Sequence, residues 1–165
     1  MNNAAADSRY DIVVAGGGMI GTSLALALAP LGLKIAVVEA VERNAAEQPS
    51  FDDRSTALSR STQRMFEAMG LWPEIVAAAT PIARIHVSDR GRFGFSHIEA
   101  DEQGVEALGY VVINRILGSV LQRTLREVVD VDVICPARIV DVELAPDQAT
   151  TCVELGSGEK LSLHG

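Results

Sequence analysis

A glycine-rich turn between two apolar segments limits the fold of this chain more than any other feature. Residues 12–29 read IVVAGGGMIGTSLALALA, and four of the ten residues from Ile12 to Gly21 are glycine. The β-branched residues 12–14 favour a strand, and residues 22–29 favour a helix that Pro30 brings to an end. The chain therefore leaves a strand and enters a helix through a turn made mostly of glycine.

The uncharged stretch around this turn also raises the alternative of a membrane or signal segment. No charged residue lies between Asp11 and Lys34, which approaches the length of a membrane-spanning helix. The stretch nevertheless contains five glycines and Pro30, and residues 1–10 lack a positively charged leader region. We therefore predict two short elements and no transmembrane segment, in a cytoplasmic protein, with peripheral association at the membrane as the alternative.

The turn fits the pattern G-x-G-x-x-G, and its surroundings make the match specific. A strand precedes it, a helix follows it, and a second apolar strand over residues 34–39 ends in Glu39, 18 residues after Gly21. This is the arrangement of a dinucleotide-binding βαβ unit. The residues that we expect to bind the cofactor are Gly16, Gly17, Gly18, Met19, Ile20, Gly21 and Glu39.

Each position in the pattern has a chemical reason. Gly16 permits the tight turn, Gly18 lets a pyrophosphate approach the backbone, and Gly21 lets the helix pack closely on the strand. The helix N-terminus offers N–H groups and a partial positive charge to the phosphates, while Glu39 accepts hydrogen bonds from an adenosine ribose. The pattern alone leaves both FAD and NAD(P) open as ligands.

Composition argues against two other classes of function. The chain has 165 residues with 22 acidic and 14 basic side chains, and the resulting net charge of -8 disfavours nucleic acid as a partner. The two cysteines are too few for a disulfide framework, and the three histidines lie in separate segments without Cys, Asp or Glu at ligand spacing. We therefore expect neither nucleic-acid binding nor a metal site.

The rest of the chain alternates between helical and strand-like patterns. Residues 59–69 have helical spacing, and residues 83–95 alternate around an Asp-Arg-Gly turn as an antiparallel hairpin. An apolar helical stripe follows Asn114, residues 131–135 read as a third buried strand, and three short segments within 138–163 read as a β-meander. We predict an α/β fold, a Rossmann-like FAD/NAD(P)-binding domain with a parallel sheet, an inserted β-hairpin and a C-terminal β-meander.

Arg115 falls in the first turn of the helix that follows Asn114. A cation there opposes the helix dipole at a cost of about 0.3–1 kcal/mol. Its presence indicates either exposure to solvent or an anion bound nearby. By residue type alone, Arg115 and Arg54 are both ordinary surface charges.

Five segments in this order resemble the N-terminal part of the class A flavin monooxygenases, which have the para-hydroxybenzoate hydroxylase fold. They are GGGMIGTSLALAL (Gly16–Leu28), VVEA (Val37–Ala40), DDRSTALS (Asp52–Ser59), HVSDRGRFGF (His86–Phe95) and LGYVVINRIL (Leu108–Leu117). Within that class the chain is similar to the ubiquinone-synthesis hydroxylases, and HVSDRG is most similar to their 2-octaprenyl-6-methoxyphenol hydroxylase branch. The resemblance spans Tyr10 to Leu163.

The resemblance implies an FAD-dependent monooxygenase that hydroxylates a prenylated phenol in ubiquinone biosynthesis, with NAD(P)H as co-substrate and O2. It implies that the glycine turn holds the FAD pyrophosphate and that Glu39 binds the adenosine ribose. Arg54 matches the family arginine that approaches the cofactor from a long loop, and Arg115 matches the arginine beside the pyrophosphate. The partners that it implies are a prenylated phenol or quinone precursor, with a second copy of the chain or other ubiquinone-synthesis proteins as further candidates.

The chain departs from the family pattern at two places. Ile113 stands where the family has a carboxylate, and the sequence reaches Gly165 before the later flavin and substrate segments of the family. We therefore expect residues 1–9 to be a flexible N-terminus and residues 10–165 to be the truncated FAD-binding domain of a longer enzyme. We expect no independent turnover from this part alone.

Two other classes of function stay open at this point. One is the Rossmann domain of an NAD(P)-dependent dehydrogenase, although the long arginine-containing connection and the hairpin depart from a simple βαβαβ order. The other is a non-catalytic nucleotide-binding remnant, which would bind nucleotide weakly and turn over nothing. The sequence assigns no catalytic acid or base.

Overall fold

The computed structural model describes residues 7–42 and 53–165. The chain forms two compact units. The first unit comprises Met1–Phe51 and Leu121–Gly165, and the second comprises Asp52–Val120.

The first unit is built on a three-stranded parallel sheet in the order β2-β3-β9. Strand β2 (Ile12–Ala15) leads through the glycine turn into helix α1 (Met19–Leu28), and β3 (Ile35–Val38) returns beside β2. Strand β9 (Val131–Ile134) pairs with the other side of β3. The predicted βαβ unit and its third strand are confirmed.

Helix α1 ends where the sequence predicts. A 3-10 turn, η1 (Ala29–Leu31), contains Pro30 and follows the helix directly, and Gly32 closes it in a left-handed conformation with φ of 70°. The uncharged stretch is thus divided between a short strand and a helix of 10 residues. None of the helices in the part of the chain that the structure describes is long and apolar enough to cross a membrane.

Strand β3 forms the centre of the core because it has a neighbouring strand on each edge. Ile35, Ala36 and Val37 are 0% exposed, and Val38 is 3% exposed. Side chains alternate along a strand, so Ile35 and Val37 face one side and Ala36 and Val38 the other. On the second side they join a hydrophobic cluster whose other buried members are Tyr10, Ala137, Val153 and Leu163.

A four-stranded sheet in the order β1-β12-β11-β10 supplies Ala137, Val153 and Leu163 to that cluster, and Tyr10 directly follows β1. Strands β10 (Ala137–Leu144), β11 (Ala149–Leu155) and β12 (Lys160–His164) are antiparallel to their neighbours in turn, which confirms the predicted β-meander. Strand β1 (Asp7–Arg9) pairs in parallel with β12. The segment predicted to be a flexible N-terminus therefore contains a paired strand, and its residues 1–6 lie outside the described residues.

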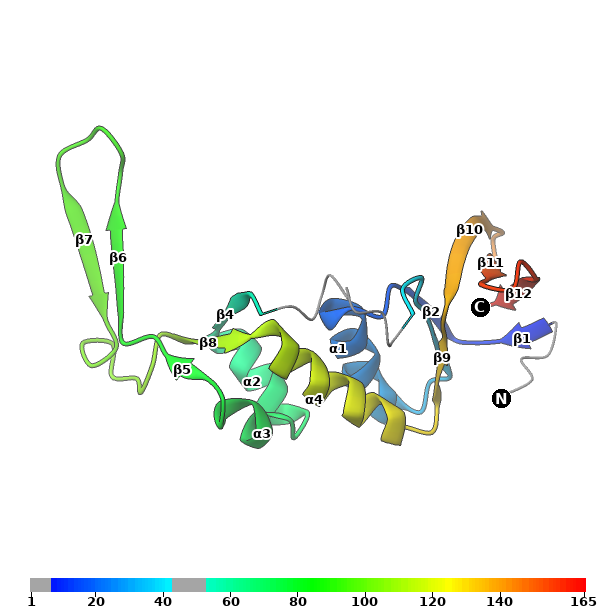
Figure 1. Ribbon diagram of the computed structural model, residues 1–165, viewed down its shortest axis with the longest axis horizontal. Coiled ribbons are helices and arrows are strands. Elements are labelled where there is room, and N and C mark those ends of the chain that lie inside the picture. Colours follow the sequence, from blue (N-terminus) through cyan, green and yellow to red (C-terminus); the bar gives the residue numbers. More distant parts are fainter. Residues whose placement is uncertain (1–6, 43–52) are drawn as a thin grey trace. The chain divides into compact units, whose positions relative to one another are not determined.

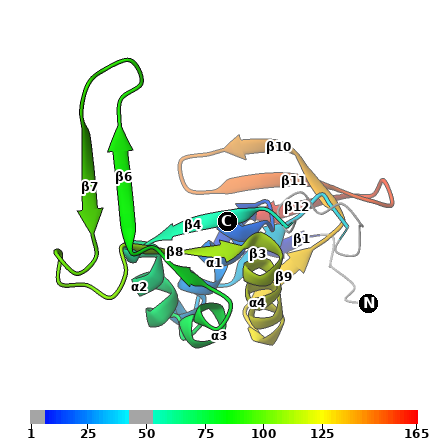
Figure 2. The same cartoon turned by 60° about the vertical axis from the view of Figure 1, so that its left-hand side comes forward.

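The second unit contains an antiparallel sheet in the order β4-β8-β5. Its strands are β4 (Ser55–Ser59), β8 (Gly109–Ile113) and β5 (Thr80–Pro81). Helix α2 (Arg60–Ala68) follows β4 and packs against β4 and β8 (Figure 2). The segment that follows Arg54 is thus a strand, which the sequence pattern does not predict.

Local signals in the sequence explain where the helices of this unit begin and end. The Ser59 hydroxyl accepts a hydrogen bond from the Thr62 N–H at 3.2 Å and caps α2, and Gly70 adopts φ of 72° after its end. Helix α3 (Trp72–Val76) begins with the ring of Trp72 edge-on to Tyr110 of β8, with 4.8 Å between ring centroids. This aromatic pair anchors the short helix to the sheet.

The predicted hairpin is confirmed as an antiparallel pair of strands. Strands β6 (Arg84–Ser88) and β7 (Phe95–Glu99) pair only with each other among the described residues, and they project from the rest of the second unit (Figures 1 and 2). Helix α4 (Asn114–Glu127) follows β8, and the boundary between the two units falls within it. Its buried residues are Asn114, Leu117, Gly118, Val120, Leu121 and Leu125.

We predict that Ile35→Ala lowers the free energy of unfolding by about 2–5 kcal/mol, because it removes buried methyl groups from the central strand and leaves a cavity. Urea unfolding followed by far-UV circular dichroism measures this change. The matched control is Val142→Ala in β10, where the side chain is 51% exposed. The control should lose less than about 1 kcal/mol, and equal losses for the two variants would contradict the central position of β3.

Candidate functional site

The glycine turn lies at the carboxyl edge of the parallel sheet. Gly16 has φ of 94°, a left-handed conformation that residues with a side chain rarely adopt. Its N–H donates to the Val38 carbonyl oxygen at 2.8 Å, so the turn is attached to the end of β3. In open α/β sheets this edge is where ligands bind.

Gly21 brings helix α1 into contact with the turn. A Cβ atom at this position would lie 1.9 Å from the Gly16 carbonyl oxygen and 3.2 Å from Cγ1 of Val14. No side chain fits between these atoms, and the oxygen belongs to the backbone, which cannot move aside as a flexible side chain would. The third glycine of the pattern therefore has the close-packing role that the sequence predicts.

Gly17 is held on both sides by hydrogen bonds. Its N–H donates to Oε2 of Glu39 at 2.6 Å. Its carbonyl oxygen accepts from the Thr22 hydroxyl at 2.9 Å and from Nε2 of Gln122 at 2.9 Å. The structure thus brings the glycine turn and the distant carboxylate together, as the sequence pattern predicts, and it adds two polar side chains that the pattern does not include.

Glu39 is held at its backbone as well as at its carboxylate. Its N–H donates to the Ile134 carbonyl oxygen at 3.0 Å, and its carbonyl oxygen accepts from the Ala137 N–H at 2.8 Å. The second carboxylate oxygen, Oε1, accepts from the Val41 N–H at 2.7 Å. A carboxylate oxygen can accept more than one hydrogen bond, so both oxygens keep capacity for hydroxyl groups of a ligand.

The N-terminus of α1 presents backbone N–H groups at this site. Gly18 is the N-cap residue, with φ of -70°, and no side chain in the described part of the chain caps it. The first turn contains no acidic residue. Met19 is half-buried and Ile20 is 87% exposed. Because the first N–H groups of a helix lack intrahelical partners, this end suits an anion such as a phosphate.

The two predicted arginines lie close to each other in the second unit. The Arg54 carbonyl oxygen accepts from the Asn114 N–H at 2.8 Å, and Asn114 directly precedes Arg115. Nε of Arg115 donates to Oδ1 of Asp53 at 2.9 Å, and the side chains of this ion pair are 63% and 81% exposed. Of the two explanations that the sequence offers for a cation in the first turn of a helix, exposure to solvent is confirmed, and a bound anion stays a prediction.

Ile113 lies next to this pair of arginines, at the end of β8. It pairs in register with Ser55 of β4 and is 36% exposed. The position that carries a carboxylate in the resembling family thus presents a partly exposed apolar side chain here.

A contact that the sequence does not reveal joins two histidines across the hairpin. His86 and His97 are opposite each other in register, with Nδ1 of His86 2.7 Å from Nε2 of His97. Within residues 7–42 and 53–165, no group of three or more His, Cys, Asp or Glu side chains is arranged to hold a metal ion.

A hollow of about 640 Å³ lies beside Glu39 at the carboxyl edge of the sheet. Ala40 and Pro136 line it where β3 and β9 end, and Val140 and Leu155 add apolar side chains. Ala137 also lines the hollow, and its N–H donates a hydrogen bond to the Glu39 carbonyl oxygen. The charged side chains of Arg138 and Glu154 also line it, so the hollow is mixed in polarity.

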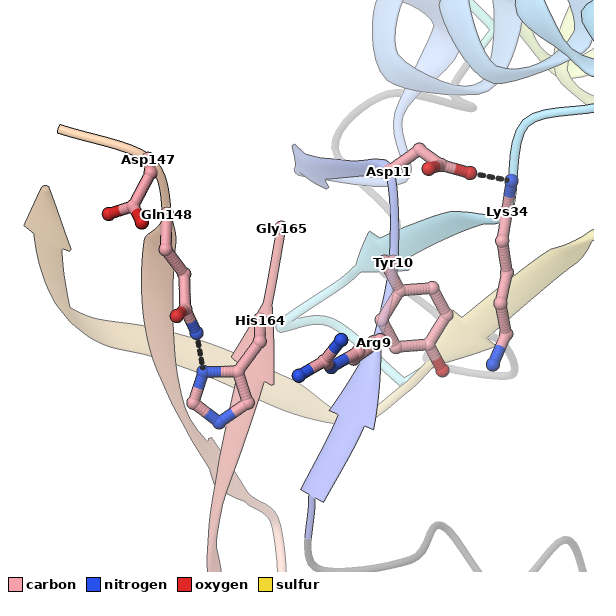
Figure 3. A pocket seen from close by; sticks show the side chains of 8 residues that line it. All are labelled: Arg9, Tyr10, Asp11, Lys34, Asp147, Gln148, His164 and Gly165. Carbon is pink, nitrogen blue, oxygen red and sulfur yellow. Dashed lines mark hydrogen bonds between the residues drawn. The ribbon is translucent and has the colours of Figure 1, made fainter. Parts of the chain in front are cut away.

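A second hollow, of about 480 Å³, lies at the amino edge of the same sheet (Figure 3). Tyr10 and Lys34 line it just before β2 and β3, with the Lys34 Nζ 4.7 Å from the centre of the Tyr10 ring. On its other side the Gln148 amide and Nδ1 of His164 lie 2.8 Å apart. Because ligands of such sheets bind at the carboxyl edge, this hollow is separate from the candidate site.

Comparison with known proteins agrees with the geometry of the turn. The sequence profile of the family described as FAD binding domain matches residues 9–149. The ubiquinone hydroxylase UbiL of Rhodospirillum rubrum is 33% identical over 135 residues, which cover 81% of this chain and 31% of the relative. The mitochondrial ubiquinone biosynthesis monooxygenase COQ6 of Xenopus tropicalis is 28% identical, over 94% of this chain and 36% of the relative. The chain thus spans about a third of the length of these relatives.

A solved structure with the same fold is that of the flavin-dependent monooxygenase PieE in complex with FAD and substrate. It superimposes with a TM-score of 0.75 at 19% sequence identity, over 95% of this chain and 29% of that protein. The match confirms the fold, and the relatives confirm the resemblance to flavin-dependent hydroxylases.

We predict that Gly21→Ala lowers the free energy of unfolding by about 1–3 kcal/mol, because the added Cβ overlaps the Gly16 carbonyl oxygen and forces α1 away from the turn. The control is Ser23→Ala in the same helix, which removes a hydroxyl bonded to the Met19 carbonyl oxygen. The control should be neutral or slightly stabilising, since such a hydroxyl competes with the helix backbone. Urea unfolding of the two variants makes the comparison, and a neutral Gly21→Ala would refute the close contact.

Proposed function

We propose that this chain, which belongs to the FAD binding domain family, is the FAD-binding part of a flavin monooxygenase that hydroxylates a prenylated phenol or quinone precursor in ubiquinone biosynthesis. The observation that carries the proposal is the glycine turn, where an uncapped helix N-terminus and the Glu39 carboxylate meet at Gly17. The names of two relatives, a ubiquinone hydroxylase and a ubiquinone biosynthesis monooxygenase, support the substrate class. We assign NAD(P)H and O2 as the co-substrates of the whole enzyme.

The residues around the turn fit the adenosine diphosphate half of FAD. The packing of Gly21 against Gly16 leaves no side chain between the helix and the turn, so a pyrophosphate can approach the N–H groups of residues 18–20. Glu39 accepts hydrogen bonds from the ribose hydroxyls with the lone pairs that Gly17 and Val41 do not use. We assign the adenine ring to the hollow beside Ala40, whose lining includes the charged side chains of Arg138 and Glu154 as well as apolar ones.

FAD, when bound, supplies the electron-transfer and oxygen chemistry of such an enzyme. The residues of this chain bind and orient the cofactor. We assign Arg54 and Arg115 to the same task, as donors to the FAD phosphates, on the basis of the family resemblance at these two positions. We assign no catalytic acid or base to the chain.

A dehydrogenase that binds NAD(P) at the same turn is the alternative from another class. The 69 residues of the second unit, Asp52–Val120, lie in the sequence between β3 and β9, where a simple βαβαβ domain has a single helical crossover. This insertion favours the flavin enzyme. A non-catalytic nucleotide-binding remnant is the other alternative, and tight FAD binding by the chain would oppose it.

We predict that the purified chain binds FAD and shows flavin absorbance, and that Gly18→Val weakens FAD binding at least about ten-fold, or about 1.4 kcal/mol. The φ of -70° at Gly18 suits valine, so the loss would come from a side chain in the path of the phosphates. Titration of FAD followed by flavin fluorescence measures the affinity, and urea unfolding without FAD checks that the variant folds. If a folded Gly18→Val variant binds FAD as tightly as the unaltered chain, the glycine turn does not bind the FAD phosphates.

We predict that Arg115→Gln weakens FAD binding about ten-fold, since a hydrogen bond between charged groups contributes about 1.5–3 kcal/mol. Unfolding without FAD should change by less than about 1 kcal/mol, because exposed ion pairs contribute little. The matched control is Arg92→Gln, which breaks another exposed ion pair, with Asp89 at 3.2 Å. If FAD affinity falls equally in both variants, or falls in neither, Arg115 does not bind the cofactor.

A further inference from the structure

We propose that Gln122 is a positioning residue for the cofactor, whose side-chain amide holds the Gly17 peptide in the orientation that binds FAD. This inference rests on the proposed function, because it concerns how the same turn is prepared for its ligand. Gln122 lies in α4, 105 residues away from Gly17 in the sequence, and its Nε2 is 2.9 Å from the Gly17 carbonyl oxygen. No sequence pattern connects the two residues.

The orientation of the Gln122 amide is fixed by its neighbours. Thr22 is 0% exposed, and its single hydroxyl hydrogen is donated to the Gly17 carbonyl oxygen at 2.9 Å. The Thr22 oxygen therefore accepts the second N–H of Gln122, at 3.3 Å. A reversed amide would place Oε1 against the Gly17 carbonyl oxygen, and two acceptors repel each other.

The fixed amide determines where the next N–H group points. The Gly17 carbonyl and the Gly18 N–H belong to one planar trans peptide, so a carbonyl held toward Gln122 directs the Gly18 N–H to the opposite side. The preceding peptide is fixed in the same way, because the Gly17 N–H is bonded to Glu39 at 2.6 Å. Two successive peptides at the start of α1 are thus oriented before any ligand arrives, and preorganised donors bind an anion without a cost of reordering.

The oxygen of the Gln122 amide shows how a positioning role can be distinguished from a stabilising role. Oε1 of Gln122 is buried and has no hydrogen-bond partner among the described residues. A buried acceptor without a partner destabilises the folded state relative to an apolar side chain of similar size. The N–H groups of the Gln122 amide thus hold the turn in its orientation, whereas its oxygen lowers the stability of the fold.

The experiment replaces Gln122 with apolar residues in the full 165-residue chain. Gln122→Leu and Gln122→Met both remove the N–H donors. Because the two side chains differ in shape, one variant can still be measured if the other fails to fold. The Gly17 carbonyl keeps its bond from Thr22, so neither variant leaves that oxygen without a partner. We expect FAD affinity about three- to ten-fold weaker, and an unfolding midpoint in urea without FAD that is unchanged or raised.

The control is Gln63→Leu in α2, the same substitution at a glutamine whose Nε2 bonds to Oε1 of Glu67 at 3.0 Å. This control should leave FAD affinity unchanged. If the unaltered chain binds FAD and both Gln122 variants bind it equally well, the positioning role is wrong and the proposed function stands. If affinity and unfolding midpoint fall together, Gln122 is a structural residue and the inference is also wrong. If the unaltered chain does not bind FAD, the proposed function fails and this inference fails with it.

Discussion

The contact between helix α1 and the Gly16 carbonyl oxygen is the constraint on which the first unit depends. The helix can begin directly at the end of β2 only because Gly21 has no side chain, since a Cβ there would lie 1.9 Å from that oxygen. This start directs α1 along the sheet, so that η1 and Gly32 can return the chain to β3 beside β2. Glu39 then follows β3 at the same edge as the turn, where its carboxylate reaches the Gly17 N–H. One missing side chain thus connects the fold to the site.

The acidic residue of the site is held by the core because it directly follows the central strand β3. Val38, which immediately precedes Glu39, is buried in the cluster formed by the parallel sheet and the β-meander. The backbone of Glu39 continues the pairing toward Ile134 and Ala137 on the β9 side. A carboxylate fixed by both backbone groups loses little conformational entropy when it binds a hydroxyl, which is the condition for an oriented rather than a flexible contact. The meander therefore supports the position of Glu39 without lining the glycine turn.

Local patterns predicted most of the fold and part of the site. The strand before the turn, the helix after it and the hairpin depend on residues close in sequence, and they appear where periodicity placed them. The contacts of Asp53 with Arg115 and of Gln122 with Gly17 join residues 62 and 105 positions apart, and no local pattern specifies such pairs. Strand β4 was missed because STALS has little apolar alternation, and its pairing with β8 is decided by tertiary structure.

Glu39 is negatively charged, and so is the phosphate that the glycine turn is suited to bind. The position of Glu39 keeps the two from competing for the same N–H groups. A carboxylate near the N-terminus of α1 competes with a phosphate for the positive end of the helix dipole, and the chain as a whole carries a charge of -8. Glu39 takes its hydrogen bond from Gly17, one residue before the N-cap, and leaves the N–H groups of residues 18–20 to other acceptors. If the phosphates of a dinucleotide bind these N–H groups, as we propose, the acid lies beside them and not among them. This separation by one peptide would let the same dinucleotide place its ribose on the carboxylate.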